Sequence, residues 1–292
     1  MKQKFRDIHL SKVNLIRLDE INQIIVTYQQ QGYRLTLRQL YYQLVSRDII
    51  PNNVKEYAKL SNLLKEGRMA GIVDWDAIED RLRKPDKPAA WDSIEDIIDA
   101  CTRQFRYDRM KNQDNYIEVW VEKDALSGVL KRVTEKYGIP IVVNRGYSSV
   151  TAMFDAHERF ERAYTLNKQH VQVIYVGDFD PSGQDMIRDI RDRIAEFGGS
   201  YDYEIIPIAL TWNQIETYTP PPNPAKLTDP RANEYIAKYG STSWEVDAIR
   251  PEVLHQIVED AIKENIDQFN YDQVLADETD AKSKLNNLKN YL

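Results

Sequence analysis

The fold of this chain is decided by two stretches, Tyr116-Ile-Glu-Val-Trp-Val-Glu122 and Val171-Gln-Val-Ile-Tyr-Val-Gly-Asp-Phe-Asp-Pro-Ser-Gly183. Each begins with a hydrophobic run of strand length and reaches acidic residues where that run ends. Helical periodicity alternates with further apolar runs around them, which predicts a Rossmann-like parallel sheet and an α/β fold. Ligands of open parallel sheets bind at the carboxyl ends of the strands. Glu122, Asp178 and Asp180 are therefore the first candidates for a functional site.

The predicted elements of the sheet follow one another along the chain. Strands are expected at 116–121, 139–143, 171–176 and 203–210, and helices at 125–137, 149–164 and 184–197. The last of these helices is expected to pack on the sheet, because one of its faces is apolar. That face consists of Met186, Ile187, Ile190, Ile194 and Phe197.

The three carboxylates together indicate a divalent cation. Asp178 and Asp180 are two residues apart at the end of an extended strand, so their side chains point to the same side. No basic residue lies between them, and gathered carboxylates are costly unless a cation neutralises them. Mg²⁺ is the expected ion, with Mn²⁺ as an alternative, and such sites usually handle phosphates. A simpler interpretation, in which Asp180 caps the next helix, accounts for only one of the three carboxylates.

The first hundred residues are typical of helices, which are expected at 15–28, 36–47 and 54–66. Thr36 and Gln39 form a capping box at the start of the second helix, and Gly67 is expected to end the third. Two helices joined by a short turn in a basic segment indicate a helix-turn-helix or winged-helix domain. Lys55 and Lys59 share one face of the third helix and are candidate DNA phosphate contacts. The solvated face of any amphipathic helix would show the same pattern.

Composition limits the class of protein. The 292 residues carry a net charge of −7, but residues 1–73 hold 12 basic and 6 acidic residues. Unless this asymmetry is due to chance, a basic module suited to DNA precedes an acidic one. No apolar run approaches the roughly 20 residues that span a bilayer, and no signal-peptide pattern is found at the start. With Cys101 as its single cysteine, the chain is expected to be cytoplasmic, without a membrane partner, and 81–88 is expected to be a linker.

The helix expected at 36–47 carries a candidate nucleophile. Its buried stripe, in projection along the axis, comprises Leu37, Leu40, Tyr41 and Leu44. Tyr42 lies about 100° further round, one turn from Arg38, and is expected to be exposed. A guanidinium in this position can stabilise a phenolate and bind a phosphate. Because tyrosine–arginine neighbours are common on protein surfaces, this pattern alone does not identify a catalytic pair.

Taken together, these residues resemble a known family. Glu122 after a first strand, followed by Asp178-Phe-Asp-Pro-Ser-Gly183 after a later one, resembles the Toprim domain of topoisomerases, primases and some nucleases. Leu37-Arg-Gln-Leu-Tyr-Tyr-Gln43 in a preceding winged helix resembles one branch of that family. The branch contains the A subunit of topoisomerase VI and the meiotic double-strand-break transesterase. The likeness covers about residues 30–210, and one departure is Gln39, where the family typically has aspartate.

The resemblance implies Mg²⁺-dependent DNA cleavage by an enzyme like the A subunit of a type IIB topoisomerase. Tyr42 would attack double-stranded DNA and form a 5′-phosphotyrosyl bond, with Arg38 beside it. Glu122, Asp178 and Asp180 would hold the cation, and Glu122 would also shuttle a proton. The family pairs the tyrosine of one subunit with the carboxylates of the other, which implies a homodimer. Strand passage would need a separate ATPase subunit, since the chain has no Walker-type phosphate loop.

The domains expected on this basis are a winged-helix DNA-binding domain, a Toprim domain and a mostly helical C-terminal extension. They span 1–110, 111–215 and 216–292. Two other functions fit the same residues: a Toprim nuclease that hydrolyses DNA with metal-activated water, and a non-catalytic DNA-binding subunit. In the extension, Glu245 and Asp247 are two further carboxylates on one side of the chain. They could approach the metal site, but a solvated strand edge or a dimer contact is the favoured interpretation.

Overall fold

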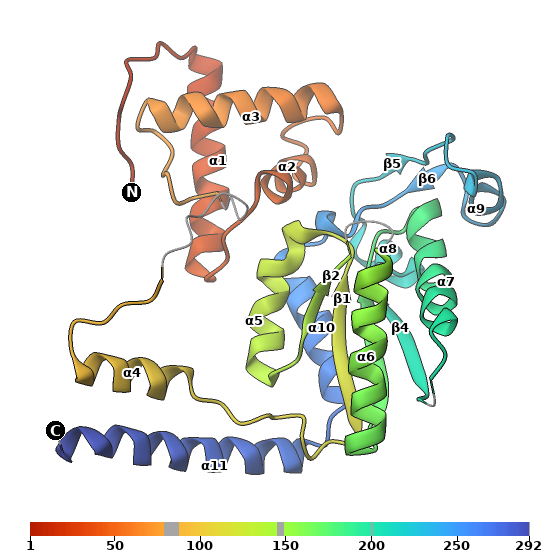
Figure 1. The fold of residues 1–292 in the computed structure, drawn as a ribbon. Helices are drawn as coiled ribbons and strands as arrows, with labels where there is room; N and C mark the ends of the chain where they lie inside the picture. The colour runs from red at the N-terminus through yellow and green to blue at the C-terminus, as the bar shows by residue number, and fades with distance from the viewer. Residues whose placement is uncertain (79–87, 145–148, 200, 292) are drawn as a thin grey trace.

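The fold is α/β, as the sequence predicts. The computed structural model describes residues 1–78, 88–144, 149–199 and 201–291, and these contain eleven α-helices and a four-stranded parallel sheet (Figure 1). The predicted linker at 81–88 lies outside the described residues except for its last residue. In the described ranges, no helix combines the length and the apolar character that crossing a membrane requires.

Residues 1–78, called the N-terminal module below, form three helices around one core. The helices are α1 (Lys12–Gln30), α2 (Leu37–Val45) and α3 (Val54–Met69). The capping box at the start of α2 is confirmed: Thr36 Oγ1 accepts the Gln39 N–H at 3.3 Å, and the Gln39 side chain accepts the Thr36 N–H at 2.8 Å. Within residues 1–78 the strand pairing is limited to isolated bridges, so these residues show three helices but no strand hairpin that could form the wing of a winged helix.

The third helix runs past Gly67, where the sequence predicts its end. Gly67 is buried, and a Cβ at this position would lie 2.9 Å from side-chain atoms of Leu18 and Val73. The glycine therefore allows α1 and α3 to approach each other closely, and the helix continues to Met69.

The sheet places its first strand in the interior. It consists of β1 (Asn115–Val121), β2 (Ile141–Val143), β3 (His170–Val176) and β4 (Tyr203–Ala209), in the order β2-β1-β3-β4. The connecting helices are the 3₁₀ helix η1 (Asp124–Leu126), α5 (Ser127–Tyr137), α6 (Val150–Asn167) and α7 (Pro181–Glu196). The predicted alternation of parallel strands and helices is confirmed. Because β2 lies on one side of β1 and β3 on the other, β1 and β3 flank the switch point where such sheets bind ligands.

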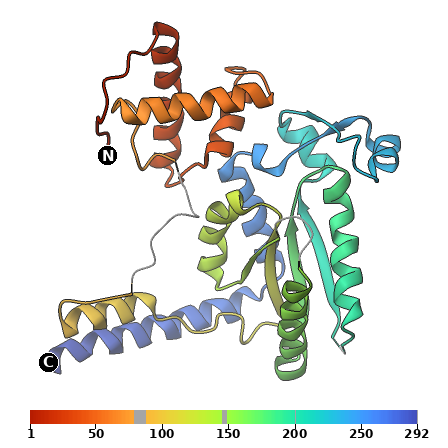
Figure 2. The ribbon, with the colours of Figure 1, turned by 45° about the horizontal axis from the view of Figure 1, so that its top comes forward.

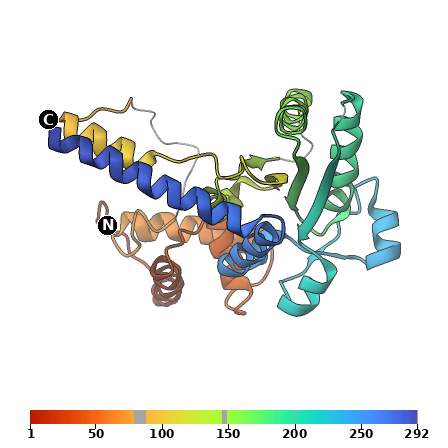
Figure 3. The same ribbon diagram turned by 90° about the horizontal axis from the view of Figure 1, so that it is seen from below.

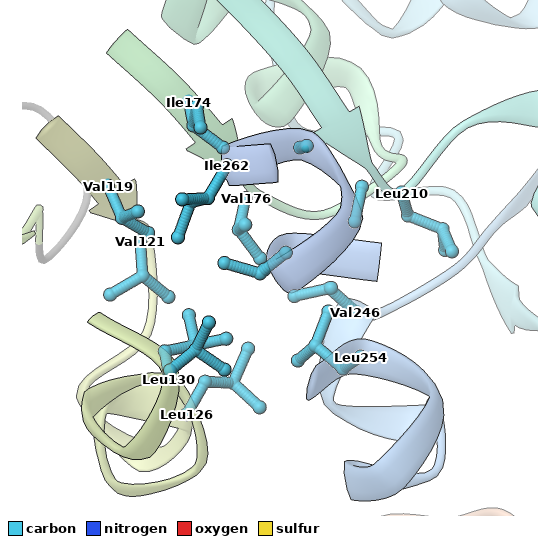
Figure 4. Close-up of a cluster of buried hydrophobic side chains, with 14 of the residues drawn as sticks. Val119, Val121, Leu126, Leu130, Ile174, Val176, Leu210, Val246, Leu254 and Ile262 are labelled. Atoms are coloured by element: carbon cyan, nitrogen blue, oxygen red, sulfur yellow. The ribbon is translucent and has the colours of Figure 1, made fainter. Parts of the chain in front are cut away.

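The two faces of the sheet are covered by different helices (Figures 1 and 3). Val119 and Val121 of β1 point into a core that they share with α5 and with α10 (Pro251–Glu264), as Figure 4 shows. Trp120, between them, points to the other face and packs with α6 and α7. This alternation follows from the pleat of a strand, and the full burial of all three side chains makes β1 the centre of the domain.

The C-terminal segment both completes the core of the sheet and extends away from it. Its remaining elements are α8 (Trp212–Tyr218), β5 (Asn223–Pro224), α9 (Ala232–Tyr239), β6 (Thr242–Ser243), η2 (Val246–Ala248), α11 (Gln268–Asn287) and η3 (Leu288–Tyr291). The helix α4 (Ile94–Gln104) lies along α11 (Figures 2 and 3). A buried ion pair of 2.8 Å between Arg109 and Glu278 anchors α11 to the chain that leads into β1.

Candidate functional site

The carboxyl ends of β1 and β3 bring two of the three predicted carboxylates into contact. The strands are in register through Val121 and Val176, so the residues that follow them meet. The backbone N–H of Asp178 donates a hydrogen bond of 3.0 Å to Oε2 of Glu122. Asp178 itself is buried, and Glu122 is half-buried.

Asp180 serves as the N-cap of α7. Its Oδ1 accepts the N–H of Gly183 at 2.7 Å and the hydroxyl of Ser182 at 2.9 Å. The simpler interpretation, in which Asp180 caps the next helix, is therefore confirmed for one of its two carboxylate oxygens. Its Oδ2 points elsewhere and lies 4.0 Å from the Lys226 ammonium. Burial raises the pKa of Glu122, and the negative charge of Asp180 adds to that rise.

Five side chains form a connected set of ion pairs, called the charge cluster below: Arg38, Lys123, Asp178, Glu245 and Asp247. The Lys123 ammonium lies 2.7 Å from Asp178, 2.9 Å from Glu245 and 3.1 Å from Asp247. Arg38 pairs with the same two C-terminal carboxylates, through its Nε to Asp247 at 2.8 Å and through a terminal nitrogen to Glu245. The cluster thus joins α2 of the N-terminal module to the ends of β1 and β3.

The interpretation as a solvated edge is wrong for Asp247, and the alternative, that Glu245 and Asp247 approach the carboxylates at the strand ends, is confirmed. Asp247 is fully buried within the subunit, with 0% of its surface exposed. The Val246 N–H donates to Asp178 at 2.8 Å, which holds the segment against the end of β3. Both carboxylates face Arg38 and Lys123 because charges that leave water need ionic partners.

Burial and ion pairing set the protonation of the charge cluster. Burial raises the pKa of Asp178 to about 7, although Lys123 opposes the rise. Burial also works to raise the pKa of Glu245, but Lys123 and Arg38 outweigh it and lower that pKa to about 2. The pKa values of Lys123 and Arg38 are raised by their acidic neighbours against the opposing effect of burial, so both stay cationic.

The expectation that Tyr42 is exposed is wrong. Only 4% of its surface is accessible, and it packs in the same core as Tyr41 and as Ala248 of η2. Residues 39–45 of α2 are all buried, so burial on this helix is not limited to the predicted stripe. Burial raises the pKa of the Tyr42 phenol, and the charges of Glu245 and Asp247 raise it further. The phenol is therefore neutral in this arrangement.

A cavity of about 470 Å³ is lined by Tyr42 and Arg38. Asn52 and Asn223 line it from opposite modules. The Asn52 amide donates to the Pro222 carbonyl at 3.0 Å and to the Asn223 side chain at 2.7 Å. These two bonds tie the proline-rich segment to the turn before α3, beside the proposed nucleophile.

The candidate DNA contacts on α3 are exposed, as predicted for phosphate contacts and equally for a solvated helix face. Lys55 extends into solvent. Lys59 pairs with Glu56 at 2.6 Å, so part of its charge is neutralised within the helix. The structure brings neither lysine to the carboxylates at the ends of β1 and β3.

The carboxylates fit a divalent cation only in part. Within the described ranges, no group of three or more His, Cys, Asp or Glu side chains could hold a metal ion. Both oxygens of Asp178 are engaged, by a backbone N–H and by Lys123. In the same ranges, Oε1 of Glu122 makes no hydrogen bond or ion pair, and Oδ2 of Asp180 has only the distant lysine. These two oxygens suit Mg²⁺, which typically takes one or two carboxylates and completes its shell with water and phosphate oxygens.

Sequence reasoning missed two residues of this site. Lys123 follows Glu122 directly, and a lysine beside three carboxylates at a strand end is a signal that the sequence does contain. Asn223 gives no such signal, since an asparagine among prolines is typical of turns. Only its position against α2 makes it part of the cavity.

The chain has no match among known proteins: no family model, no curated protein and no solved structure matches it. Its function must therefore be argued from its own residues. The site combines a buried tyrosine and an arginine on α2 with carboxylates at the ends of two central parallel strands. Ion pairs connect these two halves within one subunit.

Gly183→Ala is expected to destabilise the protein by about 1–3 kcal/mol, the usual cost of overpacking. A Cβ at this position would lie 2.2 Å from the Asp178 carbonyl oxygen, so the backbone that carries the carboxylates must shift. Urea denaturation measures the effect. Gln184→Ala is the control, since Gln184 is the next residue of α7 and is exposed. Equal stability of the two variants would contradict this role of the glycine.

Proposed function

We propose that this protein cleaves double-stranded DNA by tyrosine transesterification, as the topoisomerase VI A subunit that its motifs resemble does. The position of Arg38 carries the proposal. Its guanidinium carbon lies 5.9 Å from the centre of the Tyr42 ring, and its Nε lies 2.8 Å from Asp247. Asp247 also pairs with Lys123, which pairs with Asp178. Charged contacts within one subunit thus connect the proposed nucleophile to the proposed cation ligands.

In the proposed reaction, the Tyr42 oxygen attacks phosphorus and the bond from phosphorus to the 3′ oxygen breaks. The phenol gives up its proton and the 3′ oxygen takes one up, so one phosphodiester replaces another and no nucleotide is consumed. Glu245 lines the same cavity as Tyr42 and is the proposed proton acceptor. Its affinity for a proton rises when Arg38 turns to the phosphate, since Glu245 then loses one of its two cationic partners.

Mg²⁺ or Mn²⁺ would be held by Glu122 and Asp180, whose free oxygens were described above. When bound, the cation would neutralise negative charge on the attacked phosphate. Asp178 can join these two residues if Lys123 releases it and keeps its other two carboxylate partners. Lys123 therefore holds the place of a cation beside Asp178 until DNA is bound.

The buried position of Tyr42 means that DNA must displace part of its cover. The segment held by Asn52 is the part to be displaced, because among the described residues it is tied to the N-terminal module by hydrogen bonds from Asn52 and between Asn223 and Tyr42. Its own pairing with β6 would stay intact. A homodimer is proposed as well, because in the family that the motifs resemble the tyrosine of one subunit works with the carboxylates of the other, whereas the ion pairs described above lie within one subunit. A separate ATPase subunit would be required if the protein also passes one duplex through another.

The burial of Tyr42 also favours a second candidate, a nuclease of the Toprim type. Such an enzyme would hydrolyse DNA with water at the same carboxylates and would never use the tyrosine. A phenol that is 4% exposed and has a raised pKa is compatible with a purely structural role. A non-catalytic DNA-binding subunit is the remaining alternative, and the same experiment distinguishes all three.

The test is covalent trapping of DNA on the protein. Labelled supercoiled DNA is incubated with the protein and Mg²⁺ or Mn²⁺, the reaction is stopped with SDS, and label on the protein band is measured. We expect label on the wild type and none on Tyr42→Phe. Tyr107→Phe is the control, because it removes an exposed phenol far from the site. Trypsin would release Gln39–Arg47 with both Tyr41 and Tyr42, so fragment mass spectra must locate the adduct.

The other outcomes are equally specific. DNA cleavage that leaves no label and persists in Tyr42→Phe would establish the nuclease. DNA binding without cleavage by the homodimer, with either cation, would favour the non-catalytic subunit. An adduct on Tyr41 would overturn the assignment of the nucleophile while leaving the reaction class intact.

A further inference from the structure

A second cavity, of about 410 Å³, lies on the other side of the proline-rich segment from Tyr42. It is enclosed by the end of α2, the segment 217–221 and the start of α10. Arg47 and Arg250 line it from two different elements. No carboxylate is found among its described lining residues, so its charge is positive.

Besides the two arginines, four hydroxyls line this cavity, from Ser46, Thr217, Tyr218 and Thr219. The Ser46 and Thr217 hydroxyls already donate to the carbonyls of Gln43 and Asn213, so Tyr218 and Thr219 are the hydroxyl donors left for a ligand. Gln43 lines the cavity as well and is only 2% exposed. Its Oε1 accepts the Tyr28 hydroxyl at 2.7 Å, while its Nε2 is buried and has no hydrogen-bond partner. A buried amide donor without a partner is costly, and a turn of the side chain toward acceptor oxygens of a ligand would satisfy it.

The two arginines are largely available for a ligand. Arg47 is exposed and makes no ion pair among the described residues. Arg250 has a single acidic neighbour there, Glu252, at the long distance of 3.5 Å, and Glu252 does not line the cavity. An exposed pair of this kind contributes little and is readily exchanged for a better anion. A phosphate group, with a net negative charge and several acceptor oxygens, matches this set of donors.

We propose that this cavity binds a phosphate group, and that the phosphate belongs to the backbone of the DNA substrate. The second part rests on the proposed function. Gln43 follows Tyr42 on α2, and Arg47 lies just beyond the end of that helix at Val45. The cavity would therefore hold a phosphate close along the backbone to the one that Tyr42 attacks, and would set the register of cleavage.

The test is the salt dependence of DNA binding, measured in EDTA so that no cleavage can occur. The anisotropy of a labelled duplex is followed with the full chain and with Arg47→Ala/Arg250→Ala. Loss of one phosphate contact is expected to reduce the slope of log K against log salt by about 0.9 and the affinity about tenfold at 0.1 M salt. Arg103→Ala/Arg162→Ala removes the same charge from exposed positions on α4 and α6 and is expected to keep the wild-type slope.

All four arginines are exposed, so thermal melting should show both variants folded. The DNA assignment is overturned if inorganic phosphate raises the melting temperature of the wild type but not of Arg47→Ala/Arg250→Ala, while the DNA slopes agree. The cavity would then bind free phosphate. If wild type and Arg47→Ala/Arg250→Ala have equal slopes and inorganic phosphate does not change the melting temperature of the wild type, the phosphate site does not exist.

Failure of this inference can be told apart from failure of the proposed function. If no tyrosyl adduct forms with wild-type protein but the slope falls in Arg47→Ala/Arg250→Ala, cleavage fails and the phosphate site stands. If the adduct forms normally with wild-type protein but Arg47→Ala/Arg250→Ala keeps the wild-type slope, the cleavage proposal stands and the phosphate site fails. A shift of the cleavage position in Arg47→Ala/Arg250→Ala would support both.

Discussion

Arg38→Ala is expected to lower the rate of covalent adduct formation by about 10²–10³-fold, the usual effect of removing one preorganised donor from a site of charge development. Arg38 is the one residue that contacts both the Tyr42 ring and the carboxylates of Glu245 and Asp247 among the described residues. Its loss removes the proposed phosphate donor. The rate is measured by trapping labelled DNA under single-turnover conditions.

Two further variants make this prediction specific. Arg38→Lys keeps the charge but lacks the planar fork that pairs with two acceptors at once, so it is expected to recover only a small part of the rate. Arg34→Ala removes an exposed arginine of the same module, which donates to the Asp76 carbonyl, and is expected to keep the wild-type rate. The melting temperature of Arg38→Ala must also be measured, because this variant removes one of the two cationic partners of the buried Asp247 and can lower stability. Normal adduct formation by folded Arg38→Ala would contradict the mechanism proposed above.

Lys123→Met is expected to reduce the free energy of unfolding by about 3–5 kcal/mol, the usual cost of breaking a buried ion pair from one side. Lys123 is the only described side chain that pairs with Asp178, Glu245 and Asp247 at once. Its removal leaves Asp178 buried without a cation. The pKa of Asp178 is about 7 and rises further without Lys123, so the loss is fully present only above that pKa. Urea denaturation at alkaline pH measures it, with Lys131→Met, an exposed position on α5, as the control.

The double variant Lys123→Met/Asp178→Asn separates charge from packing. If an uncompensated buried charge causes the loss, the second substitution should restore part of the stability, because it removes that charge. Millimolar Mg²⁺ should also stabilise Lys123→Met more than the wild type, since a cation can then take the place of the lysine. A Lys123→Met protein as stable as Lys131→Met would show that the charge cluster contributes nothing to the fold.

The position of Tyr42 illustrates a limit of sequence reasoning. The helical projection of residues 36–47 separates Tyr42 from the stripe formed by Leu40 and Leu44, but all three side chains are buried in one core. The capping box at Thr36 is confirmed. Projection describes one helix on its own. It contains no information about Glu245 or Ala248, which lie about two hundred residues further along the chain and bury the tyrosine.

The carboxylates at the strand ends were also predictable from the sequence only in part. The hydrophobic runs before Glu122 and Asp178, and the alternation of strands and helices between them, can be read from the chain because strand and helix periodicity are local properties. The order β2-β1-β3-β4 cannot, since several strand orders satisfy the same local pattern. That order makes β1 and β3 neighbours and so places the two carboxylates in contact.

The sequence by itself therefore determined the α/β class, most element positions, and the acidic residues that end β1 and β3. The tertiary structure alone decided that Lys123 and Arg38 neutralise Glu245 and Asp247, and that the proline-rich segment lies between two cavities. The physical reason is the distance along the chain over which each effect acts. Periodicity and capping act over a few residues, whereas burial and ion pairing depend on which distant segments the packed core brings together.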